Sequence, residues 1–372
     1  MKGVLFMNRF SLKLLFVCLI FVLSSCSSST ISNVDSHPDE NMVVIQEEPV
    51  VQTLSFEQKV DKIMEENMFS GSILLVEDNK VKIAKGYNMA NSETMQLNGS
   101  DTVFQIGSLT KAFTAAAIMQ LQEMGKLNIN DSVQKYIEDY PYENVTLYQL
   151  LTHTAGIPNL TAFPDFISTM DIPVSVSENI AKFLNKPLEF EPGSQFAYSN
   201  SGYILLGAVI ENVSGQSYSQ FIEDHIMSPL GMGRSGYLKK DRITDDIASG
   251  YWEATERYPA MDIDMTVPYA AGGIYSTTND LYKWIQGLEE GKVINAGSWR
   301  AMRTSEKNGY GLGWGINDAE GLIYAHGGAI NGFSSFIYRD ISKGTAVIIL
   351  SNVEGVQTSE LLDLLLNVLE SE

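Results

Sequence analysis

The 372-residue chain carries 25 Lys and Arg against 45 Asp and Glu, a formal net charge of −20, and 44% of its residues are hydrophobic. This composition is typical of a globular protein and argues against a largely disordered chain. The acidic balance argues against nucleic acid as a partner, because binding to phosphate backbones depends on basic side chains that displace counterions.

The N-terminus has the pattern of an export signal. Three cations precede an apolar run over residues 14–23, which is too short to span a membrane comfortably. The run ends in Leu-Ser-Ser-Cys, which resembles a bacterial lipobox; an ordinary signal cleavage nearby is the alternative. We therefore predict a lipoprotein signal peptide over residues 1–25, lipidation of Cys26, and an exported protein anchored to the outward-facing side of the bacterial cell membrane.

Residues 26–53 are rich in Ser, Asp, Glu and Val and show little periodicity. We expect a flexible tether without chemistry of its own. Once residues 1–25 are removed, Cys26 is the only cysteine, so we expect neither an internal disulfide nor a cysteine metal site. The stability of the predicted folded domain, residues 54–372, must then come from packing.

The folded domain is expected to begin with a helix and a β-hairpin. Apolar residues recur at helical spacing over residues 56–67. Two apolar runs, residues 72–76 and 81–84, flank a turn at residues 77–80, and this pattern predicts the hairpin.

The middle of the chain has a mostly helical pattern. Apolar residues recur at i, i+3 and i+4, and Gly and Pro residues interrupt the pattern. The expected helices cover residues 109–124, 147–153, 176–184, 202–213, 218–227 and 280–288. We therefore predict an all-helical subdomain over about residues 107–284.

Strand-like runs return near the end of the chain. They cover residues 310–316, 322–325, 332–338 and 345–350, and an apolar helix follows over residues 359–369. Strands at both chain ends with helices between them predict an α+β fold, in which one antiparallel sheet is built from both ends, is flanked by helices, and carries the inserted helical subdomain. A functional site would lie in the cleft between the sheet and that subdomain.

The pattern Ser-x-x-Lys occurs twice, at Ser108 to Lys111 and at Ser132 to Lys135. Residues at i and i+3 of a helix share a face, so either pair could bring an amine beside a hydroxyl. Ser108 follows the strand-like residues 102–106 and starts a strongly apolar helix, where free amides could bind an oxyanion and burial could lower the lysine pKa. Ser132 lies in a short polar segment, where we expect a surface turn.

The pattern Tyr-x-Asn also occurs twice, at Tyr142 to Asn144 and at Tyr198 to Asn200. The second copy follows a tight turn at residues 191–194 and leads into an expected helix. Tyr198 could relay a proton if a neighbouring ammonium stabilised its phenolate, and Asn200 could bind a substrate amide. Taken alone, the pattern is equally explained by a helix cap with a packed tyrosine.

A third segment, His326-Gly327-Gly328-Ala329, ends an expected strand. Its two glycines would let a substrate backbone approach the edge of the sheet closely. By itself, His326 is as consistent with a structural role as with a functional one.

Together the three motifs resemble the class C β-lactamase and serine D-Ala-D-Ala peptidase superfamily, which includes penicillin-binding proteins and related esterases. The motifs occur in the family's order, with Tyr-x-Asn about 90 residues after Ser-x-x-Lys. Further stretches are similar to that family, at residues 150–158, 191–193, 271–277 and 310–314. The resemblance covers nearly everything after the tether and implies a DD-peptidase/β-lactamase-like fold.

The resemblance also implies roles for individual residues. Ser108 would be the acylated nucleophile, Lys111 and Tyr198 would activate it and protonate the leaving group, and Asn200 would orient the acyl amide. The backbone N–H groups of Ser108 and Ala329 would form the oxyanion hole, with His326, Gly327 and Gly328 beside the substrate. Neither a cofactor nor a metal would be required.

The third motif departs from the Lys-Thr-Gly found often in this family. An unperturbed histidine is mostly neutral at pH 7, so His326 offers a substrate carboxylate a weaker site than lysine would. This departure argues against efficient β-lactam hydrolysis. The expected partner is a small-molecule or peptide substrate, with cell-wall peptide among the candidates, and the choice between peptide, ester and β-lactam stays open.

Other functions are less well supported. The sequence contains no Gly-x-Ser-x-Gly and no His-Glu-x-x-His, and its four histidines lack metal-ligand spacing. We expect His225 to pack on a helix and His153 to brace its loop. Two alternatives remain, a carboxylesterase of the same fold and a non-catalytic peptidoglycan-binding or signalling module. The joint presence of the Ser, Lys, Tyr and Asn argues against the second.

Overall fold

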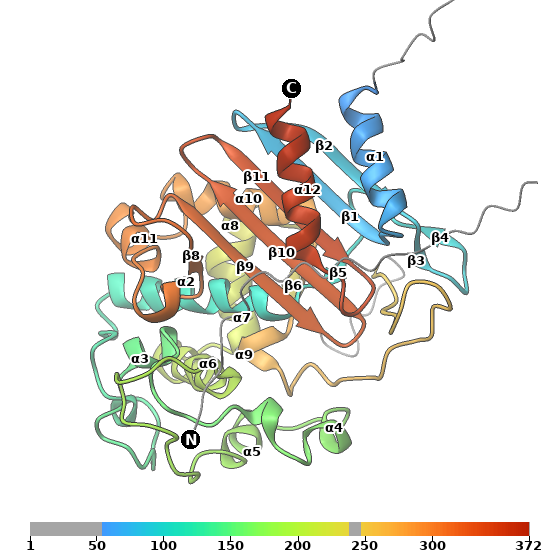
Figure 1. The fold of residues 1–372 in the computed structure, drawn as a ribbon. Coiled ribbons are helices and arrows are strands. Elements are labelled where there is room, and N and C mark those ends of the chain that lie inside the picture. Colours follow the sequence, from blue (N-terminus) through green and yellow to red (C-terminus); the bar gives the residue numbers. More distant parts are fainter. Residues whose placement is uncertain (1–53, 238–246, 372) are drawn as a thin grey trace, which may run out of the picture. The chain divides into compact units, whose positions relative to one another are not determined.

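The computed structural model describes residues 54–237 and 247–371 (Figure 1). The predicted signal peptide, the predicted lipidation site Cys26 and the predicted tether over residues 26–53 lie outside the described residues. Within the described ranges, no helix combines the length and the apolar character needed to cross a bilayer. Thr53–Glu372 form one compact unit.

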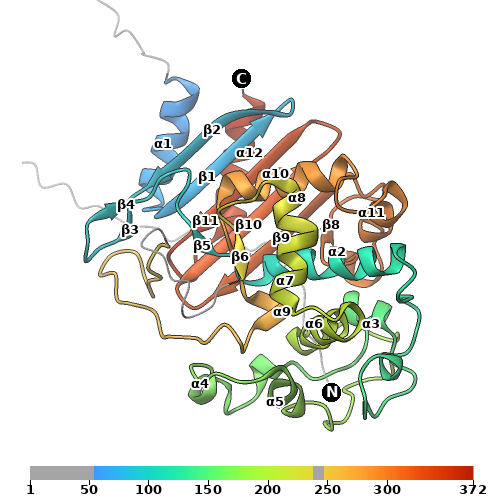
Figure 2. The same ribbon diagram turned by 180° about the vertical axis from the view of Figure 1, so that it is seen from behind.

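A six-stranded antiparallel sheet is built from both ends of the chain (Figures 1 and 2). Its strands lie in the order β2-β1-β11-β10-β9-β8. They are β1 (Gly71–Glu77), β2 (Lys80–Tyr87), β8 (Gly315–Ile316), β9 (Ile323–Ile330), β10 (Phe333–Asp340) and β11 (Thr345–Ser351). The first and last strands are neighbours, with Ile73 opposite Ile349. The structure thus confirms the predicted α+β fold with a sheet made from both chain ends.

Alternate residues of the central strands enter two separate cores, because successive side chains of a strand point to opposite faces of the sheet. In β1, Ile73 and Leu75 belong to one core, and Leu74 and Val76 belong to the other. β11 is buried along its whole length. A strand that is covered on both faces shows a continuous apolar run instead of polar alternation.

One face of the sheet is covered by two terminal helices, α1 (Phe56–Glu66) and α12 (Thr358–Glu370), as Figure 1 shows. Ser55 starts α1 with a reciprocal cap, in which the Gln58 N–H donates to Ser55 Oγ and the Ser55 N–H donates to Gln58 Oε1. Val60 of α1 and Leu365 of α12 are fully buried in the core on this side. The expected helices at both chain ends therefore pack together on the same face.

The opposite face carries the remaining helices, with α2 (Thr110–Glu123) at their centre (Figure 2). Every α2 residue from Thr110 to Leu121 is buried, so this helix lacks a polar face and lies inside the protein. The Phe113 ring of α2 stacks on Trp284, with the ring centroids 4.2 Å apart. The other helices are α3 (Leu147–Leu151), α4 (Phe166–Thr169), α5 (Val176–Ala181), α6 (Asn200–Ser214), α7 (Tyr218–Ile222), α8 (Ser228–Leu230), α9 (Tyr269–Gly272), α10 (Thr278–Glu289) and α11 (Ala296–Met302). Single turns of other helix types cover Gly107–Leu109 (η1), Val133–Lys135 (η2), Leu160–Ala162 (η3), Glu223–Met227 (η4) and Lys307–Gly309 (η6).

Two small sheets complete the described part of the chain. The strands β5 (Phe104–Gln105), β7 (Ile274–Ser276) and β6 (Gly236–Tyr237) lie in the order β5-β7-β6, and β3 (Met89–Asn91) pairs with β4 (Gln96–Leu97). β6 and β7 fall within the region predicted as all-helical, so that detail of the prediction is corrected. Strands of two or three residues are too short to show a period of two in the sequence. The small sheet places β5 beside the helical region, directly before Ser108.

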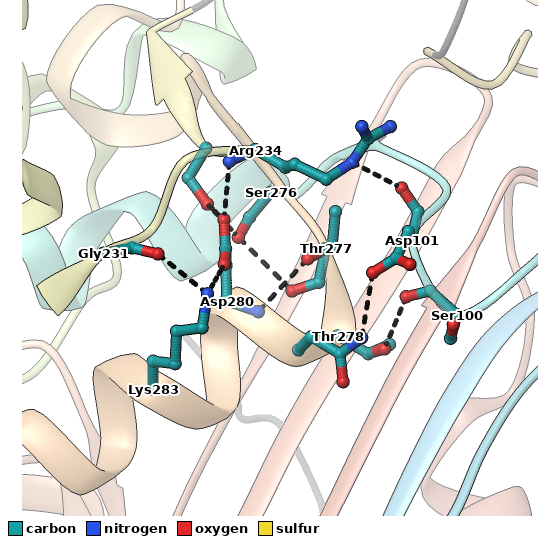
Figure 3. Close-up of polar contacts among 11 residues, drawn as sticks. Ser100, Asp101, Gly231, Arg234, Ser276, Thr277, Thr278, Asp280 and Lys283 are labelled. Carbon is teal, nitrogen blue, oxygen red and sulfur yellow. Dashed lines mark hydrogen bonds and ion pairs between the residues drawn. The ribbon is translucent and has the colours of Figure 1, made fainter.

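Figure 3 shows how the start of α10 is tied to the segment before β5. The buried Asp280 carboxylate accepts from the Arg234 backbone N–H at 2.9 Å, from the Ser235 hydroxyl at 3.0 Å and from Lys283 Nζ at 2.7 Å. Arg234 Nε donates in turn to the backbone carbonyl of Asp101 at 2.9 Å. Because a buried carboxylate needs such partners, these contacts hold the segment that leads into β5 in one position.

The strand expected over residues 310–316 is shorter in the structure. Only β8 is extended, because the chain turns before it at Gly313, whose φ is +78°. This backbone conformation favours glycine and interrupts a strand. The turn is followed by pairing of β8 with β9, and it leaves Tyr310 beside His326.

Candidate active site

Ser108 lies in η1, at the N-terminal end of the buried helix α2. Unpaired backbone amides and the helix dipole favour negative charge at such an end. The turn starts at Gly107, whose φ is +50°. A Cβ atom at this position would lie 2.8 Å from the Ala329 carbonyl oxygen, so both the conformation and the close approach of β9 require glycine.

Gly328 permits the same close approach from the β9 side. A Cβ atom there would lie 2.2 Å from the Ile106 carbonyl oxygen and 3.1 Å from Ser108 N. Ser335 Oγ on β10 donates to the same Ile106 carbonyl at 2.8 Å. At Gly327 an added Cβ would meet only ordinary contacts, the nearest at 3.5 Å. Gly328 therefore makes room for the turn that carries Ser108, whereas the sequence predicted room for a substrate.

The two backbone amides predicted as oxyanion donors lie at this junction of η1 and β9. A Cβ atom on Gly328 would lie 3.1 Å from Ser108 N, and a Cβ atom on Gly107 would lie 3.0 Å from Ala329 N, so each amide nitrogen lies close to the glycine of the other segment. Two N–H groups at one junction could stabilise the negative charge of a tetrahedral intermediate.

Lys111 is fully buried one helical turn after Ser108. Its Nζ donates to Ser108 Oγ at 3.1 Å, to Asn200 Oδ1 at 2.7 Å and to the Ala271 carbonyl at 2.8 Å. Burial holds the pKa of the Lys111 amine well below its ordinary value. A neutral amine keeps two N–H donors for Asn200 and Ala271, and its lone pair can then accept the Ser108 proton.

Asn200 starts α6 and links Lys111 to the loop around η3. Its Nδ2 donates to Asn159 Oδ1 at 3.2 Å and to Thr161 Oγ1 at 3.4 Å. The Asn200 backbone N–H also donates to Asn159 Oδ1, at 3.1 Å. These contacts determine the amide orientation, with the carbonyl toward Lys111 and the amino group toward Thr161.

Tyr198 lies over the amine of Lys111, whose Nζ is 4.9 Å from the centre of the Tyr198 ring. The tyrosine keeps 37% of its surface exposed. Burial of its hydroxyl raises the pKa of the Tyr198 phenol, and the hydrogen bond with Ser108 opposes that shift only in part. The phenol is therefore protonated at neutral pH and is placed to pass a proton to or from Ser108.

His326 lies on β9 and both of its ring nitrogens have partners within the protein. Nδ1 contacts the Gly327 carbonyl at 2.6 Å, and Nε2 contacts the Tyr310 hydroxyl at 2.9 Å. A carbonyl only accepts, so Nδ1 carries the proton and Nε2 accepts from Tyr310. Burial lowers the pKa of His326 to about 4, so the ring is neutral at pH 7.

His153 belongs to the site more directly than the sequence indicated. Its Nδ1 accepts the Ser199 backbone N–H at 3.2 Å, and its ring packs against Tyr198, with the centroids 4.2 Å apart and the planes tilted by 37°. The residue is buried and has φ +57°, so its backbone is held in an uncommon conformation. His153 thus supports the turn that presents Tyr198 and Asn200.

The sequence interpretation missed four partners of the predicted residues. They are Asn159 and Thr161 at Asn200, the Ala271 carbonyl at Lys111, and Tyr310 at His326. Two of the four, Ala271 and Tyr310, lie inside stretches that carry the family resemblance, and this was the signal that could have identified them.

The second copies of the motifs lie elsewhere on the protein. Ser132 caps η2, and Lys135 pairs with Asp131 at 2.7 Å in an exposed position. Tyr142 donates to the Lys186 carbonyl. In the part of the chain that the structure describes, no group of three or more His, Cys, Asp or Glu side chains is arranged to hold a metal ion.

Comparison with known proteins shows which family and which proteins this chain is similar to. The sequence model of the family described as Beta-lactamase matches residues 56–369. The protein PbpX of Bacillus subtilis (strain 168), whose name places it among the penicillin-binding proteins, is 30% identical over 335 residues, which cover 89% of this chain and 83% of that protein.

Solved structures share the fold. The penicillin binding protein from Bacillus halodurans has a TM-score of 0.74 at 27% identity, over 84% of this chain and 100% of that one. The D-amino acid amidase from Ochrobactrum anthropi SV3, complexed with L-phenylalanine amide, has a TM-score of 0.71 at 21% identity, over 85% of this chain and 99% of that one. At 21% identity the likeness concerns the fold.

Proposed function

The chain belongs to the Beta-lactamase family, and we propose that it is a serine hydrolase whose nucleophile is Ser108. The observation that most supports this proposal is the fully buried Lys111, whose Nζ lies 3.1 Å from Ser108 Oγ. Burying an amine costs free energy, and the resulting low pKa is what a general base requires. The family and its penicillin-binding relatives support amide or β-lactam bonds as the bonds cleaved.

In the proposed reaction, Ser108 Oγ attacks the carbonyl carbon of an amide, ester or β-lactam. The Ser108 proton passes to Lys111, and the N–H groups of Ser108 and Ala329 stabilise the oxyanion. When the intermediate collapses, the C–N or C–O bond breaks, and the leaving group takes that proton through Tyr198. Water then attacks the acyl-enzyme and releases a carboxylic acid and free Ser108.

The pKa directions favour Lys111 over Tyr198 as the base in this proposal. The pKa of Lys111 is lowered toward neutral pH, whereas the pKa of Tyr198 is raised away from it. A protonated phenol next to Ser108 suits the delivery of a proton to the leaving group.

A fluorophosphonate tests the proposal, because it reacts with an activated serine whatever the natural substrate is. We expect the full-length protein to gain the mass of one phosphonyl group, and Ser108→Ala to gain none. Ser132→Ala serves as the matched control and should be labelled like the wild type. Absence of labelling in the folded wild type, or labelling that survives in Ser108→Ala, would contradict the assignment.

We also propose that the protein acts in the cell envelope, attached to the membrane through a lipid on Cys26. The lipobox-like sequence before Cys26 supports this location, and the penicillin-binding names of its relatives agree with it. Cys26→Ser should move the protein from the membrane pellet to the soluble fraction. Equal recovery in the membrane pellet would disprove the anchor and would leave the hydrolase proposal unaffected.

A further inference from the structure

A cavity of about 570 Å³, open mouth included, lies next to Ser108 and is lined mainly by apolar side chains. The apolar lining comes from several separate parts of the chain, which are the segment from η3 to α4, helix α6, the loop before α9 with α9 itself, and the end of β9. Its main members are Leu160, Phe166, Ile204, Ile263 and Val267. Such a lining binds apolar groups by removing their surface from water.

The position of the cavity relative to the proton-transfer groups indicates which part of a substrate it receives. Ser108, Asn200 and Ala329 belong to its lining, whereas Lys111 and Tyr198 are not among the described residues that line it. The leaving group must face Tyr198, because that phenol delivers its proton. The cavity therefore extends from Ser108 on the acyl side of the bond that breaks.

The cavity and the neighbouring part of β9 offer no charge for a substrate carboxylate. Within residues 54–237 and 247–371, no Lys, Arg, Asp or Glu lines the cavity. Lys111 Nζ is buried against three acceptors of the protein itself. His326 is neutral, and its two ring nitrogens are occupied by Gly327 and Tyr310.

We propose that this cavity binds an uncharged, apolar acyl group, in an ester or amide whose leaving group carries no carboxylate. The proposal rests on acylation of Ser108 and narrows the substrate class of that site. It describes an esterase or amidase for apolar acyl groups, and it argues against a carboxypeptidase or a β-lactamase, since both of these act on substrates that bear a carboxylate.

A series of p-nitrophenyl esters tests the acyl side, since the leaving group stays constant. Each methylene group that enters the cavity should raise kcat/KM by about fourfold. The hexanoate has four more methylene groups than the acetate, so we expect it to exceed the acetate by about 16-fold if two of them enter the cavity and by about 250-fold if all four do. A kcat/KM that is level or falls from acetate to hexanoate would overturn the assignment of the cavity.

A pair of aspartate substitutions tests whether the acyl group binds in this cavity. Ile263→Asp places a carboxylate in the cavity lining and should lower kcat/KM for the hexanoate by about 10-fold or more, with little effect on the acetate. Ile172→Asp is the matched control, because Ile172 is 52% exposed and does not line the cavity. Equal losses on both esters, or equal effects of both variants, would contradict binding at this position.

A matched pair of peptides tests the leaving-group side. An N-acyl-D-Phe-D-Ala peptide with a free C-terminal carboxylate and its C-terminal amide have nearly the same shape, and only the first carries a negative charge. We expect kcat/KM for the amidated peptide to equal or exceed that for the acid. Hydrolysis of the acid about 10-fold faster would show that the site recognises a carboxylate and would overturn this part of the proposal.

Fluorophosphonate labelling distinguishes failure of the Ser108 nucleophile from failure of the apolar acyl class. If Ser108 is not labelled, the proposed function fails, and the substrate class fails with it. If Ser108 is labelled and the ester series is flat, the hydrolase remains and only the apolar acyl class is wrong.

Discussion

The two Ser-x-x-Lys segments have the same spacing and opposite surroundings. Lys111 is fully buried, and burial lowers its pKa. The Lys135 side chain is 61% exposed, and its hydrogen bond with Asp131 raises its pKa. The Ser-x-x-Lys spacing alone therefore does not determine whether the lysine is buried or how its pKa is shifted. The lysine has a lowered pKa or stays a surface cation according to whether its environment removes water from the amine.

The neighbouring residues create this difference. The residues after Lys111 are buried on all sides of α2 and are mostly apolar, so the whole turn lies in the core. The Lys135 side chain faces solvent, although Val133 and Ile137 beside it are buried, and the Ser132 side chain caps η2, accepting from the Gln134 N–H at 3.3 Å. In the first segment, desolvation of the Lys111 amine lowers the stability of the fold. In the second segment, Lys135 forms a local ion pair.

The largest expected effect comes from removing each lysine in turn. Lys111→Met should lower kcat/KM by about 10²- to 10⁴-fold, because general-base catalysis is lost. Lys135→Met should leave kcat/KM within about twofold, because an exposed ion pair contributes little. Steady-state kinetics on one activated ester, with circular dichroism to verify folding, measures both. Similar losses in the two variants would remove the distinction between the segments.

Substituting two adjacent glycines on β9 should change the free energy of unfolding by different amounts, because the surroundings of the two glycines differ. Gly328→Ala should lower the free energy of unfolding by about 3 kcal/mol, because its Cβ would lie 2.2 Å from the Ile106 carbonyl oxygen. Gly327→Ala, whose nearest contact would be 3.5 Å away, should change it by less than about 1 kcal/mol. Urea unfolding of both variants decides this, and equal stability would show that β9 does not require glycine beside Ser108.

The burial of His326 should also make the free energy of unfolding depend on pH. The pKa of His326 is about 4 in the folded protein, against 6.5 ordinarily. Between these values the unfolded chain binds more protons, so the His326 contribution is complete above pH 6.5 and falls by up to about 3 kcal/mol as the pH drops to 4.

Urea unfolding at pH 7 and pH 4.5 measures this dependence. We expect the loss of stability at the lower pH to be smaller in His326→Gln than in the wild type. His225→Gln is the control, because His225 is only partly buried and contacts Gln216. If His326→Gln kept the full pH dependence of the wild type, the neutral state of His326 would be disproved.

The smallest expected effect concerns His153. His153→Phe keeps a ring beneath Tyr198 and loses the acceptor for the Ser199 N–H, so we expect kcat to fall by about 10-fold with little change in KM. The rate of fluorophosphonate labelling should fall in parallel. A change in KM alone would contradict a role in positioning Tyr198.

The sequence predicted the features that depend on local patterns. Continuous apolar runs identified the central strands, and the order of the motifs identified Ser108, Lys111, Tyr198 and Asn200, which the structure brings together. What the sequence did not show depends on contacts between distant segments. No periodicity reveals that the Ala271 carbonyl accepts from Lys111, and the small sheet of β5, β6 and β7 is too short to have a period.

The conformation of single residues was also beyond the sequence. The contact of the His153 ring with Tyr198 depends on a left-handed backbone at a histidine, which no neighbouring residue type signals. For residues 310–316 the sequence predicted one continuous strand. In the structure, a turn at Gly313 interrupts that segment and leaves Tyr310 beside His326.

The pairing of β1 with β11 has a consequence for the order of folding. The turn that carries Ser108 lies against Gly328 and Ala329, and the strand that holds them, β9, is one of the last elements of the chain to be synthesised. Contacts between the two ends of a chain form slowly, because a long loop must close first. A chain in which β9 to β11 have not yet joined the sheet therefore lacks the contact of Gly328 and Ala329 with the turn of Ser108, so the proposed active site can form only after these strands are in place.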